Sequence, residues 1–432
     1  MSIVIDNKKI TNINISNKNV QKIVDELTGK IIFEKTKPVS NEYFYIENTY
    51  DGSNTISLKT TIGSDNITGS HATQLQYSKD KTNWTTITLS RTNTIPMNSG
   101  ERVYFRNDSG GFNWYNDSNS QDIFYTQIKC SNNHKVGGNI NSLLDYNNYN
   151  VAITPYCFYQ LFYGNEYLTD ASELIFSKTS LAPYCYQSMF SGCTSLTTAP
   201  ALPATTLADY CYNGMFGGCS SLTSAPALPA TTLVEGCYQS MFTSCSSLTS
   251  APKLPATTLA SNCYRLMFSG CTSLTTAPEL PATTLVDNCY GEMFWNCSKL
   301  TVAPALPATT LVKHCYQSMF KGCTSLTTAP ALPATTLAYY CYGGMFYGCT
   351  SLKTSPVLPA TTLVEECYYY MFYNCSSLNN VTSYANDIGS GTEYTFMWLY
   401  NVAATGTFHN LGSAIYPRND NGIPTGWTEV KN

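Results

Sequence analysis

The chain has 432 residues, a formal net charge of −4 and only 12% charged residues. So little charge excludes a basic nucleic-acid groove and a polybasic membrane surface. The sequence also lacks a run of about 20 apolar residues, the length that a membrane-spanning helix needs. The N-terminus has no continuous apolar core and no small-residue cleavage site, so it does not read as a secretory signal. We therefore expect neither nucleic-acid binding nor membrane insertion.

Residues 1–36 alternate apolar and polar side chains around turns, for example in Ile10–Ile15 and in Leu27–Phe33. Alternation of this kind predicts a small β-element. The segment resembles the N-terminal segments of phage tail and fibre proteins, which implies attachment to other virion proteins. An ordinary N-terminal hairpin is the alternative interpretation.

Residues 37–128 contain several short apolar segments separated by turn signals, which predict an immunoglobulin-like β-sandwich. Leu75–Ser78 and Trp84–Ile87 alternate about a polar turn and predict a hairpin, and Arg102–Phe105 is another expected strand. Residues 109–120 are rich in Ser, Asn, Asp and Gly and predict a loop. We expect residues 129–156 to form a connector and an N-terminal cap.

Two columns of cysteines recur with a period of 26 residues, one from Cys185 to Cys367 and the other from Cys193 to Cys375. A fixed period in this range is typical of a solenoid. A degenerate first unit begins at Cys157, where Asn165 replaces the second cysteine. The pattern predicts nine stacked units over residues 157–383, followed by a C-terminal cap over residues 384–432.

Each unit is expected to contain one strand and one helix. In the unit that begins at Leu196, Leu196–Ala199 reads as a strand, and the next residue is a proline, which ends ladder pairing. Leu207–Cys219 has apolar residues four apart and predicts a short amphipathic helix with Thr206 as its N-cap. The fold class is thus an α/β leucine-rich-repeat solenoid of parallel strands plus short helices. Helices need about 8 to 10 Å of spacing and strands about 4.8 Å, so the helices are expected on the convex side.

The repeating unit resembles the BspA-like leucine-rich repeats of gut-bacterial surface proteins and of phages of gut bacteria. The resemblance rests on the recurring Leu-Pro-Ala-Thr-Thr and Cys-Tyr-Xaa-Xaa-Met-Phe segments, and on the ending Asn421–Thr428. The family has an Ala-Phe pair where this chain has Met-Phe, as at Met215. The resemblance covers roughly residues 130–432. It implies the solenoid fold and a general role in adhesion, and it transfers no catalytic residue.

The cysteines are expected to be buried thiols, because both columns lie on the apolar face of the unit. Disulfides between neighbouring units and metal ligands are the alternatives, although the spacing Cys-x7-Cys is not a zinc spacing. Leu-Pro-Ala-Thr-Thr resembles a sortase signal, but it recurs many times and has no apolar tail. No nucleophile elbow, phosphate loop or metal triad occurs, and adjacent carboxylates such as Glu365 and Glu366 cannot project to one point from a helix. We expect neither an enzyme nor a cofactor.

The outward positions of the repeats vary while the core columns barely change. Aromatic residues gather in the C-terminal units among Asn, Ser and Gly, a composition typical of binding surfaces. Neutral variation of a solvated face is the alternative. The candidate binding residues, expected to be solvent-exposed on the convex side, are Trp295, Tyr339, Tyr340, Tyr347, Tyr369, Tyr370 and Tyr373.

Together these features predict a phage virion protein, a tail or head fibre, whose solenoid binds a host cell-surface glycan or protein. The N-terminal segment would contact other virion proteins. One alternative is a secreted or surface-attached bacterial BspA-like adhesin, located outside the cell or on its surface. A second alternative is a purely structural virion decoration or spacer. The sequence leaves the ligand open, and it leaves open whether the protein is a homo-oligomer.

Overall fold

The computed structural model describes residues 3–5, 8–10, 22–24, 31–34, 42–61, 74–89, 92–107, 114–115, 123–388 and 393–431. The chain divides into two compact units, Met1–Asn41 and Glu42–Asn432. In the first unit, β1 (Ile3–Ile5) pairs with β2 (Lys8–Ile10), and β3 (Lys22–Val24) pairs with β4 (Ile31–Glu34), both antiparallel. Strands are therefore present within predicted segment 1–36, and the rest of that segment lies outside the described residues.

The second unit begins with a β domain made of two sheets. The strands are β5 (Phe44–Asn48), β6 (Asn54–Thr61), β7 (Gln74–Ser78), β8 (Thr85–Thr88), β9 (Asn93–Met97), β10 (Arg102–Arg106), β11 (Trp114–Tyr115), β12 (Ile123–Cys130) and β13 (His134–Asn139). One sheet has the order β13-β5-β10-β7-β8 and the other the order β11-β12-β6-β9, with antiparallel neighbours throughout. The predicted hairpin is confirmed as β7–β8. The immunoglobulin-like topology stays a prediction.

The boundaries of this domain differ from the predicted ones. β11 forms a short strand inside the predicted loop 109–120, whose other residues are outside the described part of the chain. The sheet does not end at residue 128, because β13 continues it into the predicted connector 129–156. After β13 comes the short 3-10 helix η1 (Ile140–Leu143). The apolar residues of both sheets, including Ile46 and Leu58, belong to the same core cluster as the repeats.

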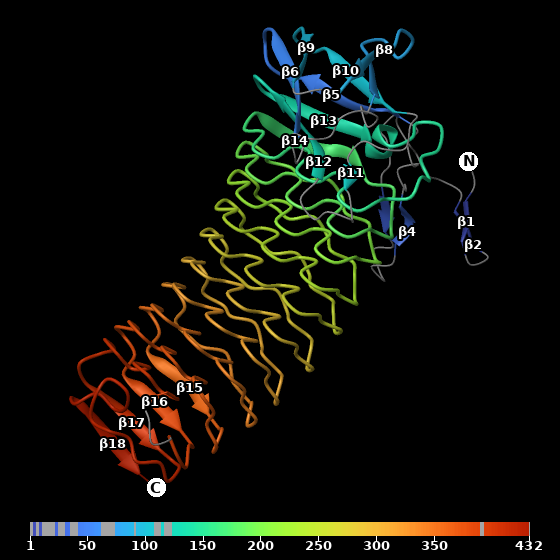
Figure 1. Ribbon diagram of the computed structural model, residues 1–432. Coiled ribbons are helices and arrows are strands. Elements are labelled where there is room, and N and C mark those ends of the chain that lie inside the picture. The colour runs from blue at the N-terminus through green and yellow to red at the C-terminus, as the bar shows by residue number, and fades with distance from the viewer. Residues whose placement is uncertain are drawn as a thin grey trace. The chain divides into compact units, whose positions relative to one another are not determined.

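The solenoid follows directly from this sheet. β14 (Leu168–Ile175), in the first repeat unit, pairs with β13 in a parallel arrangement. The larger sheet of the β domain is thus extended by the first unit, and the later units stack onto it as one elongated array (Figure 1). The β domain and the solenoid therefore share one sheet and one hydrophobic core.

The predicted helices are absent. Between Leu207 and Cys219 the backbone forms consecutive turns, and the same holds in every described unit. The N–H groups of Cys211, Met215 and Cys219 donate to the carbonyl three residues earlier, at 3.0 to 3.1 Å. The alternate N–H groups point out of the unit, so that Tyr212 donates to the Cys237 carbonyl and Phe216 to the Met241 carbonyl, at 3.1 and 2.9 Å. Half of the N–H groups of this segment therefore bind the next unit, which an α-helix would not allow.

This turn segment requires a left-handed residue at every fourth position. Tyr210, Gly214 and Gly218 have φ values of 54°, 60° and 75°, and the equivalent positions in the other units are also positive. Gly and Asn tolerate this conformation best, and many of these positions carry them. Thr206 is not a helix N-cap. Its backbone instead forms a parallel bridge with Ser180.

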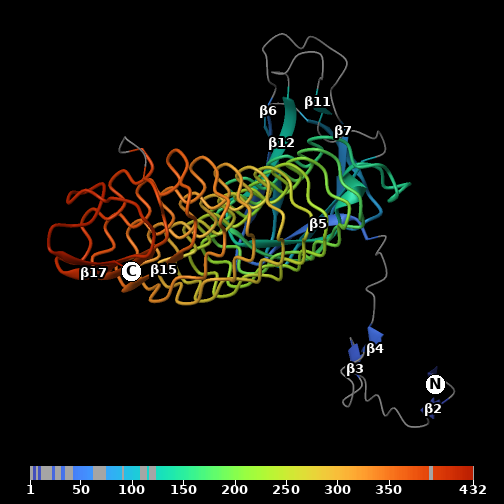
Figure 2. The ribbon, with the colours of Figure 1, turned by 90° about the horizontal axis from the view of Figure 1, so that it is seen from below.

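The opposite side of each unit pairs in parallel, as predicted, but mostly through single residues. Thr198 forms a parallel bridge with Asp170, and Ser224 forms one with Ser250. After β14, the described residues of the solenoid form full strands only near the C-terminus, in β15 (Thr354–Leu358), β16 (Asn380–Ser383), β17 (Gly406–Asn410) and β18 (Trp427–Lys431). These four form a parallel sheet in chain order, and β15 and β17 lie along one long side of the stack (Figure 2).

The core consists of columns of identical side chains. Met215, Phe216 and Tyr212 are buried, and stacked rings of neighbouring units lie 5.3 to 6.2 Å apart. The turn side is therefore spaced far more closely than the 8 to 10 Å of packed helices, and the curvature argument from helix packing does not apply.

All eighteen cysteines are buried free thiols, as predicted. In the second column each thiol donates to a phenylalanine carbonyl of the preceding unit, for example Cys219 Sγ to Phe190 O at 3.1 Å. In the first column burial is the main cause that raises the pKa of thiols such as Cys263, so these groups stay protonated and unreactive.

Within the predicted cap 384–432, residues 393–401 first continue the solenoid by another turn segment. Tyr368, Tyr370 and Phe372 donate their N–H groups to the carbonyls of Tyr394, Phe396 and Trp398 at 2.9 to 3.0 Å, as one repeat does to the next. The Trp398 ring is buried in the tyrosine column, stacks on Tyr368 and donates from Nε1 to the Gly422 carbonyl at 2.9 Å. The stack therefore has another turn segment beyond the last cysteine pair.

Candidate ligand-binding surface

The consecutive turns present one continuous face, which we call the turn face. It consists of the outward residues between the core columns, such as Tyr210, Asn213 and Gly217 in one unit. Because neighbouring units are joined by hydrogen bonds 25 or 26 residues apart, equivalent outward residues form columns along the stack. A side chain on this face thus meets its counterparts in the units before and after it.

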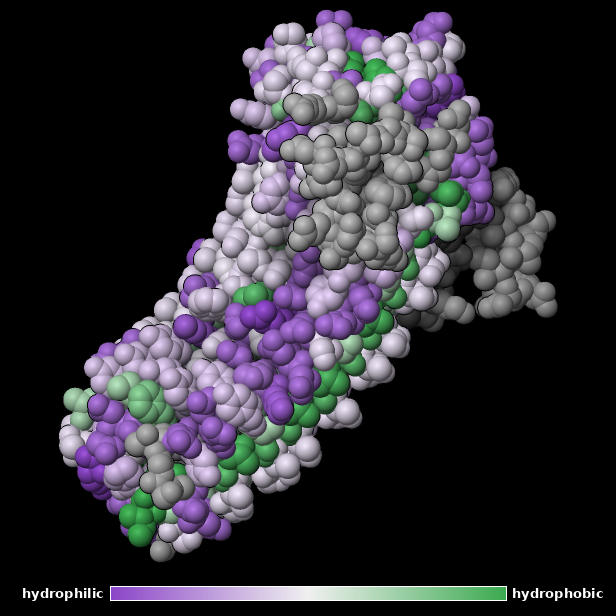
Figure 3. All heavy atoms as spheres, in the orientation of Figure 1, coloured by the Kyte–Doolittle hydropathy of each residue, from purple (hydrophilic) through white to green (hydrophobic). Residues whose placement is uncertain are grey.

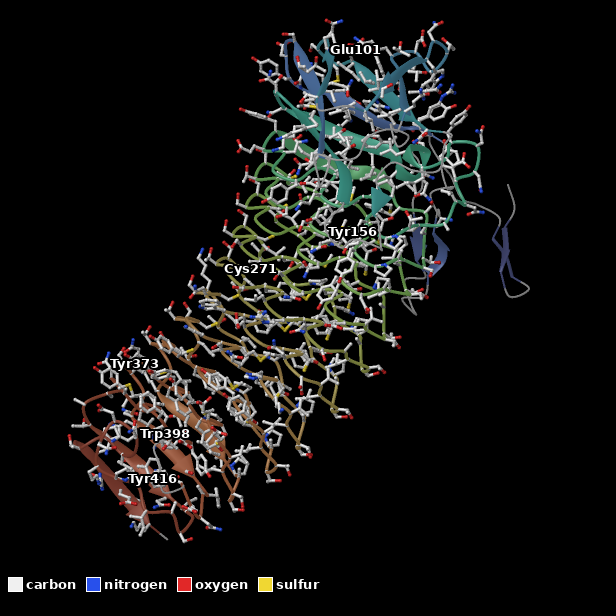
Figure 4. The ribbon with its side chains drawn as sticks, viewed as in Figure 1. Glu101, Tyr156, Cys271, Tyr373, Trp398 and Tyr416 are labelled. Carbon is white, nitrogen blue, oxygen red and sulfur yellow. The ribbon has the colours of Figure 1, made fainter. Side chains whose placement is uncertain are left out.

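The structure brings all seven predicted residues together on this face. Six of the rings form a continuous chain of contacts. The distances between ring centroids are 6.0 Å for Tyr339–Tyr340, 5.5 Å for Tyr340–Tyr369, 4.3 Å for Tyr369–Tyr370, 5.1 Å for Tyr370–Tyr373 and 4.7 Å for Tyr373–Tyr347. Trp295 joins through Lys321, whose Nζ lies 5.0 Å from the Trp295 ring and 4.7 Å from the Tyr347 ring. Tyr373 lies near the C-terminal end of the stack in Figure 4.

The expectation that these rings are freely exposed is only partly right. Tyr339 is exposed, with 38% of its surface accessible, whereas the other six are half-buried. The cause is mutual packing, since the rings of Tyr347 and Tyr373 stack at an angle of 16° and cover each other's faces. The surface therefore presents mainly ring edges and hydroxyl groups to solvent.

Sequence reasoning missed four members of this group. His314 lies against Tyr339 and Tyr340 at 5.3 and 5.5 Å. Phe396 stacks on Tyr369 at 5.3 Å, and Tyr400 stacks on Tyr373 at 4.9 Å. Phe396 and Tyr400 lie in the predicted cap, outside the predicted repeats. Lys321 and His314 are neither tyrosine nor tryptophan, the two residue types that predicted the binding surface. We call the full set the C-terminal aromatic surface: Trp295, His314, Lys321, Tyr339, Tyr340, Tyr347, Tyr369, Tyr370, Tyr373, Phe396 and Tyr400.

The hydroxyl groups of Tyr339, Tyr340 and Tyr373 are held in the protonated form. Burial, followed by the charge effects of neighbouring groups such as Tyr369 and Glu366, raises the pKa of Tyr340 to about 12. The Tyr339 hydroxyl donates to the Glu366 carboxylate, which raises the pKa of that phenol. Burial also raises the pKa of Tyr373. These three hydroxyls can therefore donate hydrogen bonds at neutral pH and do not act as phenolate nucleophiles.

Among the described residues, no group of three or more His, Cys, Asp or Glu side chains is arranged to hold a metal ion. Within the same residues, no helix is long and apolar enough to cross a membrane. The face seen in Figure 3 is mostly hydrophilic, apart from a hydrophobic stripe along one edge of the solenoid. The C-terminal aromatic surface offers aromatic and hydrogen-bonding contacts to a ligand.

A model of the BspA type leucine rich repeat region matches the chain in six copies, over residues 145–301, 239–354 and 333–416. The chain belongs to the BspA-type leucine-rich repeat family. The matched residues include the first repeat unit and the segment that carries Phe396 and Tyr400, so this BspA-type region contains nearly the whole solenoid.

No curated protein matches this BspA-type chain. A solved structure that matches is the crystal structure of a TLR13–ssRNA13 complex, with 16% sequence identity and a TM-score of 0.23. The match covers 58% of this chain and 31% of that chain, so this chain spans about a third of that structure's length. A superposition at this level carries no argument about fold or ligand.

Proposed function

We propose that this BspA-type protein is a non-catalytic recognition protein that attaches to a cell surface through the C-terminal aromatic surface. The observation that carries the proposal is that all the aromatic residues on the variable positions of the last units join into one network of ring contacts. The core does not need them, because Cys341, Met345 and Phe346 already fill the inner side of that unit. Rigid rings lose little conformational entropy on binding, which suits them as anchors.

A triple variant tests this proposal. Tyr339→Ser, Tyr347→Ser and Tyr373→Ser together remove three rings that face outward from two successive units. Fluorescently labelled protein should bind a panel of gut bacterial strains, and the triple variant should lose at least about tenfold in affinity, since anchor rings contribute about 2 kcal/mol or more. Tyr384→Ser is the matched control, because Tyr384 is 39% exposed but makes no ring contact with this surface.

Normal attachment of the triple variant, with a melting temperature close to that of the wild type, would show that this surface is not the binding site. Equal loss in the Tyr384→Ser control would also count against the proposal, because the effect would not be specific to the ring network.

We further propose that the protein acts on a phage virion, as a tail or head fibre. Support comes from the resemblance of residues 1–36 to fibre N-termini and from the separate N-terminal unit Met1–Asn41. A bacterial BspA-like adhesin on the cell surface and a structural virion decoration are the alternatives. Mass spectrometry of purified phage particles should detect the chain at a fixed ratio to capsid protein. Its absence from particles and presence in bacterial envelope fractions would favour the adhesin.

A further inference from the structure

A second group of rings lies at the other end of the same turn face. Tyr156 stacks on Tyr184 at 4.6 Å with nearly parallel planes, and Tyr184 stacks on Tyr210 at 5.2 Å. Tyr159 meets Tyr156 at 5.7 Å and Tyr125, from β12, at 5.3 Å. We call these five residues the N-terminal tyrosine patch, and Tyr156 lies near the β domain in Figure 4, far from Tyr373.

The two groups share columns of the solenoid. Tyr156, Tyr184 and Tyr210 occupy the position that His314 and Tyr340 occupy in later units, and all five have a positive φ. Between them the same column carries Gly236, Asn262 and Asn288. The Tyr210 ring lies directly over Gly236, where a Cβ atom would approach the ring to 2.3 Å, so the glycine ends the stack and buries its own backbone under the ring. The column thus has aromatic rings toward both ends and small residues between them.

The groups between the two ends form hydrogen bonds but carry little free charge. Asn288 Nδ2 donates to Asn262 Oδ1 at 2.8 Å, which forms an amide ladder along the axis. Arg265 is paired with Glu292 at 3.2 Å. Asn288 Oδ1 is buried and Asn262 Oδ1 already accepts from Asn288, so these two side chains offer amide N–H donors to a ligand that lies along the stack.

The rim of the turn face is acidic. The column just before the tyrosine position carries the exposed carboxylates of Asp209, Glu235, Asp287 and Glu365, against one exposed lysine, Lys313. Repulsion from this rim disfavours a polyanion such as a nucleic acid or an acidic polysaccharide. A neutral ligand with many hydroxyl groups matches the ring edges, phenol hydroxyls and amides of the face.

The distance between the groups requires a long ligand. Tyr210 and His314 are four units apart, and units paired like strands are about 4.8 Å apart, which places the inner edges of the two groups roughly 20 Å from each other. We propose that the turn face binds one neutral, unbranched polysaccharide chain along the solenoid axis, and that the N-terminal tyrosine patch is a second subsite for it. This inference rests on the proposed function and adds the chemical class of the ligand and its direction.

The test uses an array of neutral, unbranched polysaccharides, namely linear β-1,3-glucan, β-1,4-xylan, β-1,4-mannan and β-1,4-galactan, followed by size-fractionated oligosaccharides of the one that binds. Wild-type affinity should rise with oligosaccharide length until the chain spans roughly 20 Å, because the second contact is then intramolecular. The double variant Tyr184→Ser/Tyr210→Ser should lose at least about tenfold for long oligosaccharides and nothing for short ones. Tyr50→Ser, an exposed tyrosine of the β domain, is the control.

If the serine variant does not fold, Tyr184→Phe/Tyr210→Phe replaces it. This change keeps the stacked rings and removes both hydroxyls. The Tyr210 hydroxyl already donates to Glu235 Oε1 at 2.8 Å, so affinity for long oligosaccharides should fall about fivefold, the effect of one lost hydrogen bond from Tyr184.

Unchanged affinity of the folded double variant for long oligosaccharides would overturn the second subsite, whatever the triple variant of the C-terminal aromatic surface does. No binding to any of the four polysaccharides would overturn the glycan assignment. The proposed function would survive either result if the triple variant still lost attachment to cells, and the partner would then be a surface protein.

Discussion

The buried tyrosine column shows which part of a side chain stabilises the stack. Tyr186, Tyr212, Tyr238 and Tyr290 are almost fully buried, and their hydroxyl oxygens have no hydrogen-bond partner among the described residues. In the first unit the column begins with Phe158, which stacks on Tyr186 at 5.6 Å without any hydroxyl. The stacked ring is therefore the stabilising part, and the buried hydroxyl costs free energy.

Tyr212→Phe should consequently leave the melting temperature unchanged or raise it, with a gain of up to about 1 kcal/mol in the free energy of unfolding. Tyr416→Phe is the matched control. The buried Tyr416 hydroxyl hydrogen-bonds to Ser383 Oγ at 2.8 Å, so its removal should cost about 1 kcal/mol. Differential scanning calorimetry of both variants checks the opposite signs. A clear loss of stability in Tyr212→Phe would mean that its hydroxyl has a stabilising partner.

At the scale of the element, a series of consecutive turns and an α-helix predict opposite effects of a Gly218→Ala substitution on stability. Gly218 has a φ of 75°, and a Cβ atom there would approach no atom closer than 3.6 Å, so added volume is tolerated and only the backbone conformation matters. Gly218→Ala should therefore destabilise the protein by about 1 kcal/mol. In a helix the same change would stabilise by about 1 kcal/mol.

Gly218→Asn should cost less than Gly218→Ala, because Asn296 and Asn374 already hold this position at 57° and 59°. Thermal denaturation monitored by circular dichroism measures both variants. A higher melting temperature for Gly218→Ala than for the wild type is the result that the turn segment does not allow.

The same element explains what the sequence could and could not predict. The buried columns, the parallel direction and the free thiols follow from a strict 26-residue period, which needs no knowledge of the backbone. The helix was wrong because apolar residues four apart, such as Cys211, Met215 and Cys219, fit a helix and a series of turns equally well. The available signal was the recurrence of Gly, Ser or Asn before the second cysteine, as at Gly218, which a helix would not favour.

For the candidate surface, variation among the repeats was enough to predict that the seven candidate aromatic residues lie on one face. It could not show that they bury one another, because ring contacts such as Tyr347 on Tyr373 depend on a spacing of about 5 Å rather than the spacing of helices. Phe396 and Tyr400 were missed because the sequence pattern of cysteines stops at Cys375, whereas the hydrogen-bonded stack continues.

At the scale of the whole second unit, the β domain and the solenoid meet at a buried histidine. Asn165, which stands where later units have a cysteine, donates from Nδ2 to the Ile128 carbonyl and to His134 Nε2, at 3.1 and 3.0 Å. His134 Nδ1 lies 3.0 Å from the Asn132 carbonyl, so the network is satisfied by the neutral ring with its proton on Nδ1. Burial lowers the pKa of His134 to about 4.

This depressed pKa predicts how stability depends on pH. Above about pH 6.5 the ring is neutral in both the folded and the unfolded chain, and the stability is fully present. As the pH falls toward 4, the unfolded chain takes up a proton that the folded chain does not, so the free energy of unfolding drops by roughly 1.4 kcal/mol per pH unit. NMR chemical shifts of the His134 ring should show a neutral imidazole at pH 5.

His134→Gln removes the titrating group, so its melting temperature should fall less than that of the wild type between pH 7 and pH 4.5. Protonation of the native ring near pH 6.5 would contradict the buried neutral state.

The hydrogen bonds between neighbouring turns, such as Tyr212 N–H to Cys237 O at 3.1 Å, run along the long axis of the stack. A pulling force applied to the two ends of the solenoid therefore acts parallel to the hydrogen bonds between neighbouring units. Units then detach one after another from an end, instead of all interfaces shearing at once. A released unit of 26 residues adds about 85 to 95 Å of extended chain, in place of the roughly 5 Å that it occupied. Under tension, a solenoid of this kind that is bound to a surface lengthens stepwise and remains attached.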